Sequence, residues 1–389
     1  MSNTPKKPRI IIITPFFPPN LGGVETHLSQ LTNYLSTHHF PTTVLTYKPL
    51  SIKTNYYRQE CHPYLNIYRF WWFGLGLFDR TTPYPPIQFL YIVPGLLLRS
   101  LIFCLQSRNK FDVIHAQGFA AAFVARIIKL FFPHRIYVVS THFIYRRLQP
   151  TSLYAHLFKW VLAGFNTILA ISHQSHQELL ATGLKPNRVK VYRYWTDQKK
   201  FTPGNKQKAR NLLNISSKNR LVVFFAGRLV KMKGIFTLLQ VAKKVPPDLL
   251  FILAGDGPDG PKLKALSLGL DNFKLVGIVN HQQIVNYYSA SDLVIIPTQA
   301  EEALSNTFIE TISCGRPVVC TNKGSVSEMV HNSFGITINP TPKNIYHTLM
   351  HLYHHPKLIA SLSLQAKKFA RENFSVKNAR VIIDSYVND

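Results

Sequence analysis

The chain alternates short apolar runs with longer stretches in which apolar residues recur every three or four positions. The short runs are rich in Ile, Val and Phe, as in strands of a parallel sheet covered on both faces, and the longer stretches predict the covering helices. The runs form two series, separated by residues 195–220, where the apolar periodicity is lost. The predicted strands are Arg9–Thr14, Thr43–Thr46, Asp112–His115, Ile136–Ser140, Thr167–Ile171 and Val189–Tyr192, then Leu221–Ala226, Leu249–Ala254, Phe273–Val276, Leu293–Pro297, Pro317–Cys320 and Gly335–Ile338.

Two series of strand and helix predict an α/β protein of two Rossmann-like domains. At 389 residues the chain is too long for one ordinary hydrophobic core. The stretch between the series contains Lys199, Lys200, Pro203 and Gly204, a composition typical of a linker. We therefore expect an N-terminal domain at residues 1–200 and a C-terminal domain at residues 201–371.

Residues 68–105 are more aromatic and apolar than the rest of the chain. The run from Ile87 to Leu105 approaches the length of a membrane span, but Pro94, Gly95 and Arg99 fall inside it. Three interpretations stay open. The stretch is a core helix, an element that lies in a membrane interface with its arginines near lipid phosphates, or a true span.

The composition is strongly basic. Lys and Arg number 45 and Asp and Glu 18, which gives a formal net charge of +27 and an attractive field for anionic partners. The basic residues are spread over both halves and accompany no nucleic-acid-binding motif, which favours a lipid surface over nucleic acid. The four cysteines lack the spacing of a zinc site or a disulfide framework, and the apolar run at Ile10–Ile13 is too short for a signal peptide. We expect a cytoplasmic protein.

Two glycine-containing loops follow predicted strands. Gly22 and Gly23 come after the first strand and open a helix, an arrangement that lets backbone amides approach a phosphate, although it also suits an ordinary turn. The second loop begins at Gly227 and carries Arg228 and Lys233 before the next helix. Two such cations at the carboxyl end of a parallel strand can bind a diphosphate.

An acidic pair follows the strand that ends at Pro297. Glu302 lies in the turn, and Glu310 lies in the second turn of a helix that begins near Ser305. Both carboxylates can face one site and accept hydrogen bonds from sugar hydroxyls. The amides of Leu304, Ser305 and Asn306 then point toward phosphates. Acids near a helix start are also common on ordinary protein surfaces, because they complement the helix dipole.

In their order, these motifs resemble the retaining GT-B glycosyltransferases known as group 1 or family 4. The resemblance spans nearly the whole chain, and the spacing between Glu302 and Glu310 matches that of the family's two glutamates. The motifs that carry it are Gly22-Gly-Val-Glu25, Asp112-Val-Ile-His115, Ser140-Thr-His142, Gly227-Arg-Leu229, Lys233-Gly234, Gly255-Asp-Gly257, Gly277-Ile-Val279, Glu302 and Glu310.

The resemblance implies a hexose transfer from a UDP- or GDP-sugar to a hydroxyl acceptor, lipid-linked or part of a cell-envelope glycan, with retention of the anomeric configuration. It implies catalytic roles for His142, Arg228, Lys233 and Glu302, with the two cations holding the diphosphate. It further implies a last helix, residues 372–389, that crosses back to the N-terminal domain. The implied donor-binding residues are Gly22, Gly23, Gly227, Ile278, Val279, Leu304, Ser305, Asn306 and Glu310.

In such enzymes the leaving phosphate takes the acceptor's proton. No cofactor and no metal are expected, because Arg228, Lys233 and helix N-termini supply the positive field. The chain departs from the family at Tyr194–Asp197, where an Asn-Gly-Val-Asp-like turn is usual, and after the first glutamate, at residues 303–306. The second departure leaves the identity of the donor sugar open.

Two other classes remain as alternatives. Nucleotide-sugar epimerases and other GT-B enzymes share the fold but fit the motif order less well. A non-enzymatic binder of anionic lipid or nucleic acid accounts for the charge, but it leaves the cations and acids at strand ends without a role.

Overall fold

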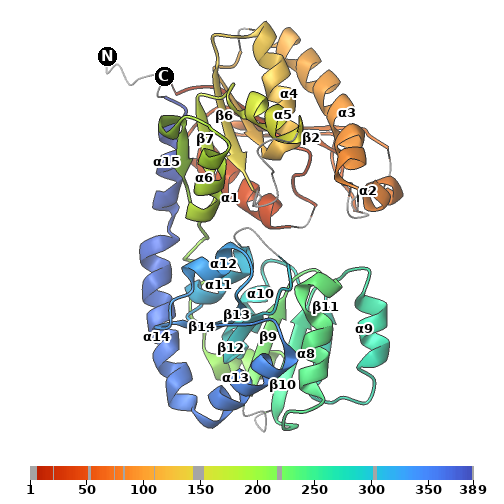
Figure 1. Ribbon diagram of the computed structural model, residues 1–389, viewed down its shortest axis with the longest axis vertical. Helices are drawn as coiled ribbons and strands as arrows, with labels where there is room; N and C mark the ends of the chain where they lie inside the picture. The colour runs from red at the N-terminus through yellow and green to blue at the C-terminus, as the bar shows by residue number, and fades with distance from the viewer. Residues whose placement is uncertain are drawn as a thin grey trace. The chain divides into compact units, whose positions relative to one another are not determined.

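The computed structural model describes residues 7–20, 22–50, 54–73, 75–81, 84–108, 110–142, 153–216, 221–300 and 305–387. The chain divides into two compact units (Figure 1). Unit 1 comprises Met1–Tyr194 and Lys377–Asp389, and unit 2 comprises Trp195–Val376. Each unit is a Rossmann-like layer of parallel strands with helices on both faces, as the strand pattern predicts.

The sheet of unit 1 has the order β3-β4-β2-β1-β5-β6-β7-β8. Its pairs are parallel except for β3 and β4, which form an antiparallel edge. The six strands predicted here are present, whereas the sequence analysis missed β3 and β4. The bounds are β1 Ile10–Ile13, β2 Thr42–Tyr47, β3 Gln59–His62, β4 Leu65–Phe70, β5 Val113–Gln117, β6 Ile136–Thr141, β7 Thr167–Ala170 and β8 Val189–Val191.

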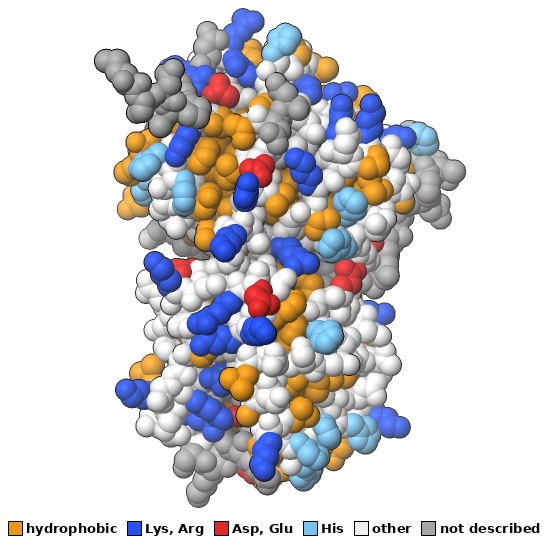
Figure 2. Space-filling view, turned by 90° about the vertical axis from the view of Figure 1, so that its left-hand side faces the viewer, with side chains coloured by type: hydrophobic (Ala, Val, Ile, Leu, Met, Phe, Trp, Pro, Cys, Tyr) orange, Lys and Arg blue, Asp and Glu red, His pale blue; other side chains and the backbone are white. Residues whose placement is uncertain are grey.

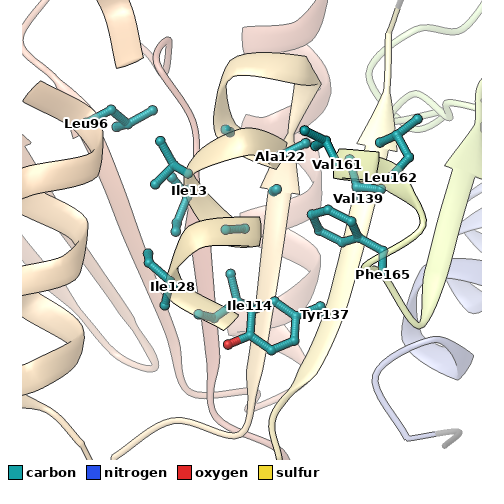
Figure 3. Close-up of a cluster of buried hydrophobic side chains, with 14 of the residues drawn as sticks. Ile13, Leu96, Ile114, Ala122, Ile128, Tyr137, Val139, Val161, Leu162 and Phe165 are labelled. Atoms are coloured by element: carbon teal, nitrogen blue, oxygen red, sulfur yellow. The ribbon is translucent and has the colours of Figure 1, made fainter. Parts of the chain in front are cut away.

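Helices cover both faces of this sheet. Side chains of α3, α4, α5 and α6 share one apolar cluster with Ile13, Ile114 and Val139, residues of the central strands. Figure 3 shows the part of this cluster that α3, α4 and α5 contribute. The connection from β1 to β2 runs along the sheet in the opposite direction to the connections that contain α3, α4, α5 and α6. Because such crossovers are right-handed, α1 covers the other face. The bounds are α1 Gly23–Thr37, α2 Leu75–Thr81, α3 Pro85–Gln106, α4 Gly118–Phe131, α5 Leu153–Leu162, α6 His173–Ala181 and α15 Ala379–Asp384, with short 3₁₀ turns at Pro186–Arg188 and Val376–Asn378.

Helix α3 contains the apolar stretch that the sequence left open. It runs through Pro94 without ending there, and it buries Ile92, Leu96 and Cys104 in the core. By length and composition α3 could cross a membrane, but the core helix of a soluble protein meets the same criteria. Of its most apolar stretch of 18 residues, 39% is buried. The opposite face of α3 leaves Leu90 and Leu98 exposed.

The sheet of unit 2 has the order β11-β10-β9-β12-β13-β14, with every pair parallel. All six predicted strands are present. The strands are β9 Leu221–Ala226, β10 Leu249–Ala254, β11 Phe273–Gly277, β12 Leu293–Ile296, β13 Val318–Thr321 and β14 Gly335–Ile338. The helices are α7 Lys206–Leu212, α8 Ile235–Ala242, α9 Gly260–Leu266, α10 Ile284–Ala290, α11 Asn306–Ser313, α12 Ser325–Met329, α13 Pro342–His354 and α14 Pro356–Asn373, with a 3₁₀ turn at Lys231–Lys233.

Alternate residues of β9 belong to two different cores. Val223 and Phe225 pack with α8 and α13, whereas Val222 and Phe224 pack with α7 and α10. This period of two is what a strand buried on both faces requires. Because both faces of β9 are packed against helices, the end of the strand is held in place, and with it the start of the loop that follows.

The C-terminal segment belongs to unit 1. The chain returns to that unit at Lys377, and the α15 region brings Tyr386 to β5, where its hydroxyl lies 2.7 Å from Nδ1 of His115. Both residues are buried. The end of the chain thus contributes a hydrogen bond to the centre of the first sheet.

Candidate functional site

The loops at the carboxyl edge of the unit 2 sheet are joined by backbone hydrogen bonds. The amide of Gly227 donates to the carbonyl of Ala254 at 3.0 Å, and that of Gly255 donates to Gly277 at 2.8 Å. The amide of Leu229 donates to Asp256 at 2.9 Å. The loops after β9, β10 and β11 therefore form one continuous structure rather than three independent turns.

Glycines are required where these loops meet. Gly234 has a φ of +74°, and a Cβ there would lie 2.0 Å from the carbonyl oxygen of Pro297, at the end of β12. Gly255 has a φ of +139°, and its Cβ would lie 1.9 Å from the carbonyl oxygen of Gly227. A side chain at either position would clash with backbone that cannot move aside. Gly234 and Gly255 are thus sites of close backbone approach.

The two predicted diphosphate-binding cations lie in this structure. Arg228 follows β9 and is exposed, and Lys233 is half-buried in the 3₁₀ turn before α8. The turn is held to the end of β12 by the amide of Gln299, which donates to Met232 at 2.8 Å. The fold thus places both cations on the one loop that joins β9 to α8.

Helix α11 begins beside this loop. The hydroxyl of Thr307, in its first turn, donates to the carbonyl of Ala226 at 3.2 Å, which places Ser305 and Asn306 next to the end of β9. The side chain of Ser305 does not cap the helix by a hydrogen bond within the described part of the chain. Glu302 and Leu304 lie outside the described residues.

Glu310 is buried, and its carboxylate has a fixed orientation. Tyr288, on α10, donates its hydroxyl to Oε2 of Glu310 at 2.8 Å, and Nε2 of His281 lies 3.4 Å from Oε1. Burial, and then the negative charge of Glu310, raise the pKa of Tyr288 well above its ordinary value, so the hydroxyl keeps its proton as the donor. Glu310 is thus held in place from α10 as well as by its own helix.

The loop after β11 presents the predicted Ile278 and Val279. Gly277 ends the strand with a φ of +71°, and Ile278 is 61% exposed while Val279 is half-buried. An exposed apolar residue beside a basic loop is the kind of surface on which a planar base can lie.

In unit 1, the carboxyl edge of the sheet carries Gly22, Gly23 and His142. The two glycines are exposed at the start of α1, and the carboxyl group of the following Glu25 has a pKa raised by burial. His142 is buried, with Nε2 2.9 Å from Oε1 of Gln117 and Nδ1 2.8 Å from the hydroxyl of Tyr194.

His142 belongs to a cluster of buried histidines. The Nε2 atom of His115 lies 3.1 Å from the side-chain amide nitrogen of Gln117 and 2.8 Å from the hydroxyl of Ser140. The ring of His27 stacks on that of Tyr194, with 4.0 Å between the ring centroids. Burial lowers the pKa of both His115 and His142 to about 3, and it lowers that of His27 well below its ordinary value. All three rings are neutral at physiological pH.

No group of three or more His, Cys, Asp or Glu in the described ranges is arranged to hold a metal ion. The four cysteines are free thiols, with Cys61 exposed and the others buried.

Comparison with known proteins decides the family. Residues 206–369 match the family model for glycosyl transferases of group 1, and residues 21–193 match the model for glycosyltransferase family 4. The chain belongs to the group 1 and family 4 glycosyltransferases. The predicted family is therefore confirmed over both units.

Relatives and solved structures resemble this glycosyltransferase over most of its length. A phosphatidylinositol N-acetylglucosaminyltransferase subunit of Arabidopsis thaliana is 24% identical over 88% of this chain and 73% of its own. The structure of sucrose-phosphate synthase from Thermosynechococcus elongatus matches with 18% identity and a TM-score of 0.80 over 98% of each chain. That of Anabaena HepE in complex with UDP-glucose matches with 20% identity and a TM-score of 0.75 over 97% of this chain and 98% of its own. These structures confirm the GT-B fold.

Sequence analysis of the glycosyltransferase missed several residues that the structure places at the site. Tyr288 and Thr307 position the acid and the first turn of α11, and Gln117 and Tyr194 bond to His142. Each acts on a partner that is 22 to 81 residues away along the chain. None of them belongs to a local motif, so only the fold brings them to their partners.

The contact at Gly234 can be tested by Gly234→Ala. We expect the free energy of unfolding to fall by roughly 3 kcal/mol or more, because a left-handed conformation and a backbone clash add together. Gly269→Ala is the matched control. Its φ is +81°, but no heavy atom lies within 4 Å of the added Cβ, so it should cost only about 1–2 kcal/mol. Urea unfolding measures both variants, and equal losses would show that the contact with Pro297 is not a constraint.

The histidine cluster predicts how stability depends on pH. The ordinary pKa of histidine is near 6.5, so below about pH 6.5 the unfolded chain binds protons that the buried rings do not. Stability is therefore full above pH 6.5 and falls toward pH 3, by about 1.4 kcal/mol per pH unit for each buried histidine.

Urea unfolding between pH 7.5 and 4.5 measures this slope. His142→Gln should flatten it by about 1.4 kcal/mol per pH unit, because one proton-binding difference is removed. His347→Gln, at an exposed position of α13, is the control. The same slope in both variants would contradict a neutral, buried His142.

Proposed function

We propose that this glycosyltransferase moves a hexose from a UDP- or GDP-sugar to a hydroxyl of a lipid-linked or cell-envelope acceptor, with retention of configuration and without a metal ion. The observation that carries the proposal is the joined loop structure of unit 2. It presents Arg228, Lys233 and the first turn of α11 at one edge of the sheet, where the leaving nucleotide would acquire negative charge.

The donor-binding part of the proposal follows from the chemistry of these groups. Arg228 and Lys233 would stabilise the diphosphate as the bond to the sugar breaks, and Glu310, held by Tyr288, would accept hydrogen bonds from ribose hydroxyls. Ile278 would lie against the base. The Anabaena structure in complex with UDP-glucose supports a nucleotide sugar of this kind as the donor.

We propose that Glu302 contacts the donor sugar and that His142 contributes to the site in unit 1 as a neutral hydrogen-bonding group. Both nitrogens of His142 are engaged, and burial keeps its pKa near 3, which makes it a poor proton acceptor at neutral pH. The acceptor's proton then goes to the leaving phosphate. In this scheme the protein positions and stabilises the reacting groups but takes no proton itself.

Replacing the two cations tests the donor site. Arg228→Ala and Lys233→Ala should each weaken binding of UDP or GDP and reduce turnover by about 10- to 100-fold, because each removes a charged partner worth roughly 1.5–3 kcal/mol. Titration calorimetry with each nucleotide and release of nucleoside diphosphate from a panel of UDP- and GDP-sugars measure the effects.

Lys244→Ala, at an exposed position after α8, is the matched control and should leave both measurements unchanged. EDTA should not reduce turnover of the unmodified enzyme. Full donor affinity in the variants that lack Arg228 or Lys233 would rule out the proposed diphosphate site, and loss of activity in EDTA would rule out metal independence.

We also propose that unit 1 associates with the cytoplasmic face of an anionic membrane. The exposed face of α3 carries Ile87, Leu90, Leu98 and Leu105, and Arg99, beside Leu98 in the sequence, is exposed as well. Basic side chains are scattered over the displayed face of the molecule with few acidic ones between them (Figure 2). A relative named for transfer to phosphatidylinositol supports a lipid acceptor, which such a surface would bring within reach.

Sedimentation with vesicles tests the membrane association. Anionic vesicles should carry the enzyme down and neutral ones should not, and added salt should weaken binding because it screens the charges. Leu90→Asp, on the exposed face of α3, should reduce binding. Leu268→Asp, exposed in unit 2, is the control for the same change elsewhere. Binding that is absent, insensitive to salt or equal in the two variants would contradict the proposal.

A further inference from the structure

Unit 2 contains a cavity at the edge of the sheet opposite to the predicted donor loops. Its walls include Leu221, Asp292 and Arg316, which lie at the amino ends of β9, β12 and β13, whereas the donor loops follow the carboxyl ends of strands. The cavity has a volume of about 620 Å³, within the range of small-ligand sites. It therefore lies apart from the groups that the proposed transfer uses.

The cavity has apolar walls. The apolar residues of the lining include Leu352 at the end of α13, Ile359 and Leu364 on α14, and Pro203 before α7. Gly315 has a φ of +65° and packs closely against Pro203, because a Cβ there would lie 3.0 Å from the proline ring. These surfaces suit the apolar part of a ligand.

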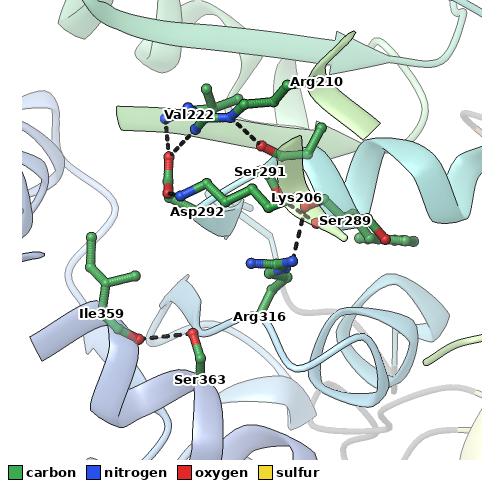
Figure 4. Close-up of polar contacts among 11 residues, drawn as sticks. Lys206, Arg210, Val222, Ser289, Ser291, Asp292, Arg316, Ile359 and Ser363 are labelled. Atoms are coloured by element: carbon green, nitrogen blue, oxygen red, sulfur yellow. Dashed lines mark hydrogen bonds and ion pairs between the residues drawn. The ribbon is translucent and has the colours of Figure 1, made fainter. Parts of the chain in front are cut away.

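The polar lining is mainly basic. Lys206, Arg316 and Lys367 face the cavity together with a single carboxylate, Asp292. That carboxylate is already occupied. It accepts from Nη2 of Arg210 and from the amide of Val222, both at 2.7 Å, and it pairs with Lys206 (Figure 4). Positive charge at the cavity is thus only partly neutralised by the protein.

Arg316 has unused hydrogen-bonding capacity. Its Nη2 donates to the carbonyl of Ser289 at 2.9 Å, but its buried Nε has no partner among the described residues. Burial lowers the pKa of the guanidinium, which nonetheless stays charged at physiological pH. Because Nε is shielded from solvent, an anion in the cavity would interact with the charge of the guanidinium rather than with Nε itself.

From this arrangement we propose that the cavity binds a small anionic amphiphile, a phosphate or carboxylate group attached to a compact apolar body. The anionic group contacts Arg316 and Lys367, and the apolar body lies along Leu352 and Ile359. The site is independent of the donor loops, and the inference does not rest on the proposed transfer.

Titration calorimetry with octyl phosphate, below its micelle concentration, tests the inference. Octyl phosphate should bind, whereas inorganic phosphate and octyl glucoside should bind at least about tenfold more weakly, because each lacks one half of the ligand. Equal binding of either comparison compound would overturn the proposal. No binding of octyl phosphate would overturn it as well.

Variants locate the binding. Lys367→Ala and Arg316→Ala should each weaken binding of octyl phosphate by about tenfold, and Ala360→Phe should block it by filling the cavity without removing a charge. Lys368→Ala, at the next position of α14, is the matched control. Thermal unfolding confirms that each variant is folded. If Arg316→Ala does not fold, Ala360→Phe still tests the site.

A double variant separates this site from the donor site. In Arg228→Ala/Lys233→Ala, octyl phosphate should bind with unchanged affinity even where nucleotide binding is lost. Loss of octyl phosphate binding in that variant would show that the compound occupies the donor loops instead.

Discussion

The close approach of backbone at the carboxyl edge of the unit 2 sheet is the constraint on which the predicted donor site depends. Gly255 meets Gly227, and Gly234 meets Pro297, at distances that exclude any side chain. These contacts lock the loops after β9, β10 and β12 to one another. The apolar strands fix where the loops begin, and the glycines fix how they meet, so Arg228 and Lys233 stand on a rigid support.

The charge distribution also favours the binding of anionic groups. Several acids form ion pairs within the fold. Asp112 pairs with Arg9 at 2.9 Å, and Asp292 pairs with Arg210 at 2.7 Å. Because 45 basic residues face only 18 acidic ones, much positive charge has no carboxylate to pair with. That excess is available to phosphates, whether of a nucleotide or of a lipid, and it acts over distances limited by the Debye length.

Sequence was sufficient for the repeating architecture and for the local motifs. Uniformly apolar strands and glycines at strand ends leave a signal within a few residues, and all twelve predicted strands are present. The antiparallel β3 was missed because it is largely exposed and lacks the apolar signature. The neighbouring β4, in which buried and half-buried residues alternate, was missed as well. Pro94 suggested an interruption, yet α3 continues through it and packs along α4. Tyr288 and Thr307 were invisible because their partners are distant in sequence.

The histidine cluster shows why the role of His142 could not be assigned from its residue type alone. Since Oε1 of Gln117 can only accept, Nε2 of His142 must carry the proton and Nδ1 must accept from Tyr194. The amide nitrogen of Gln117 then donates to Nε2 of His115, whose Nδ1 donates to Tyr386. One side-chain amide thus sets the tautomers of two neutral rings. A histidine held this way orients its neighbours but has no free lone pair, so in the proposed transfer His142 is not the group that takes the acceptor's proton.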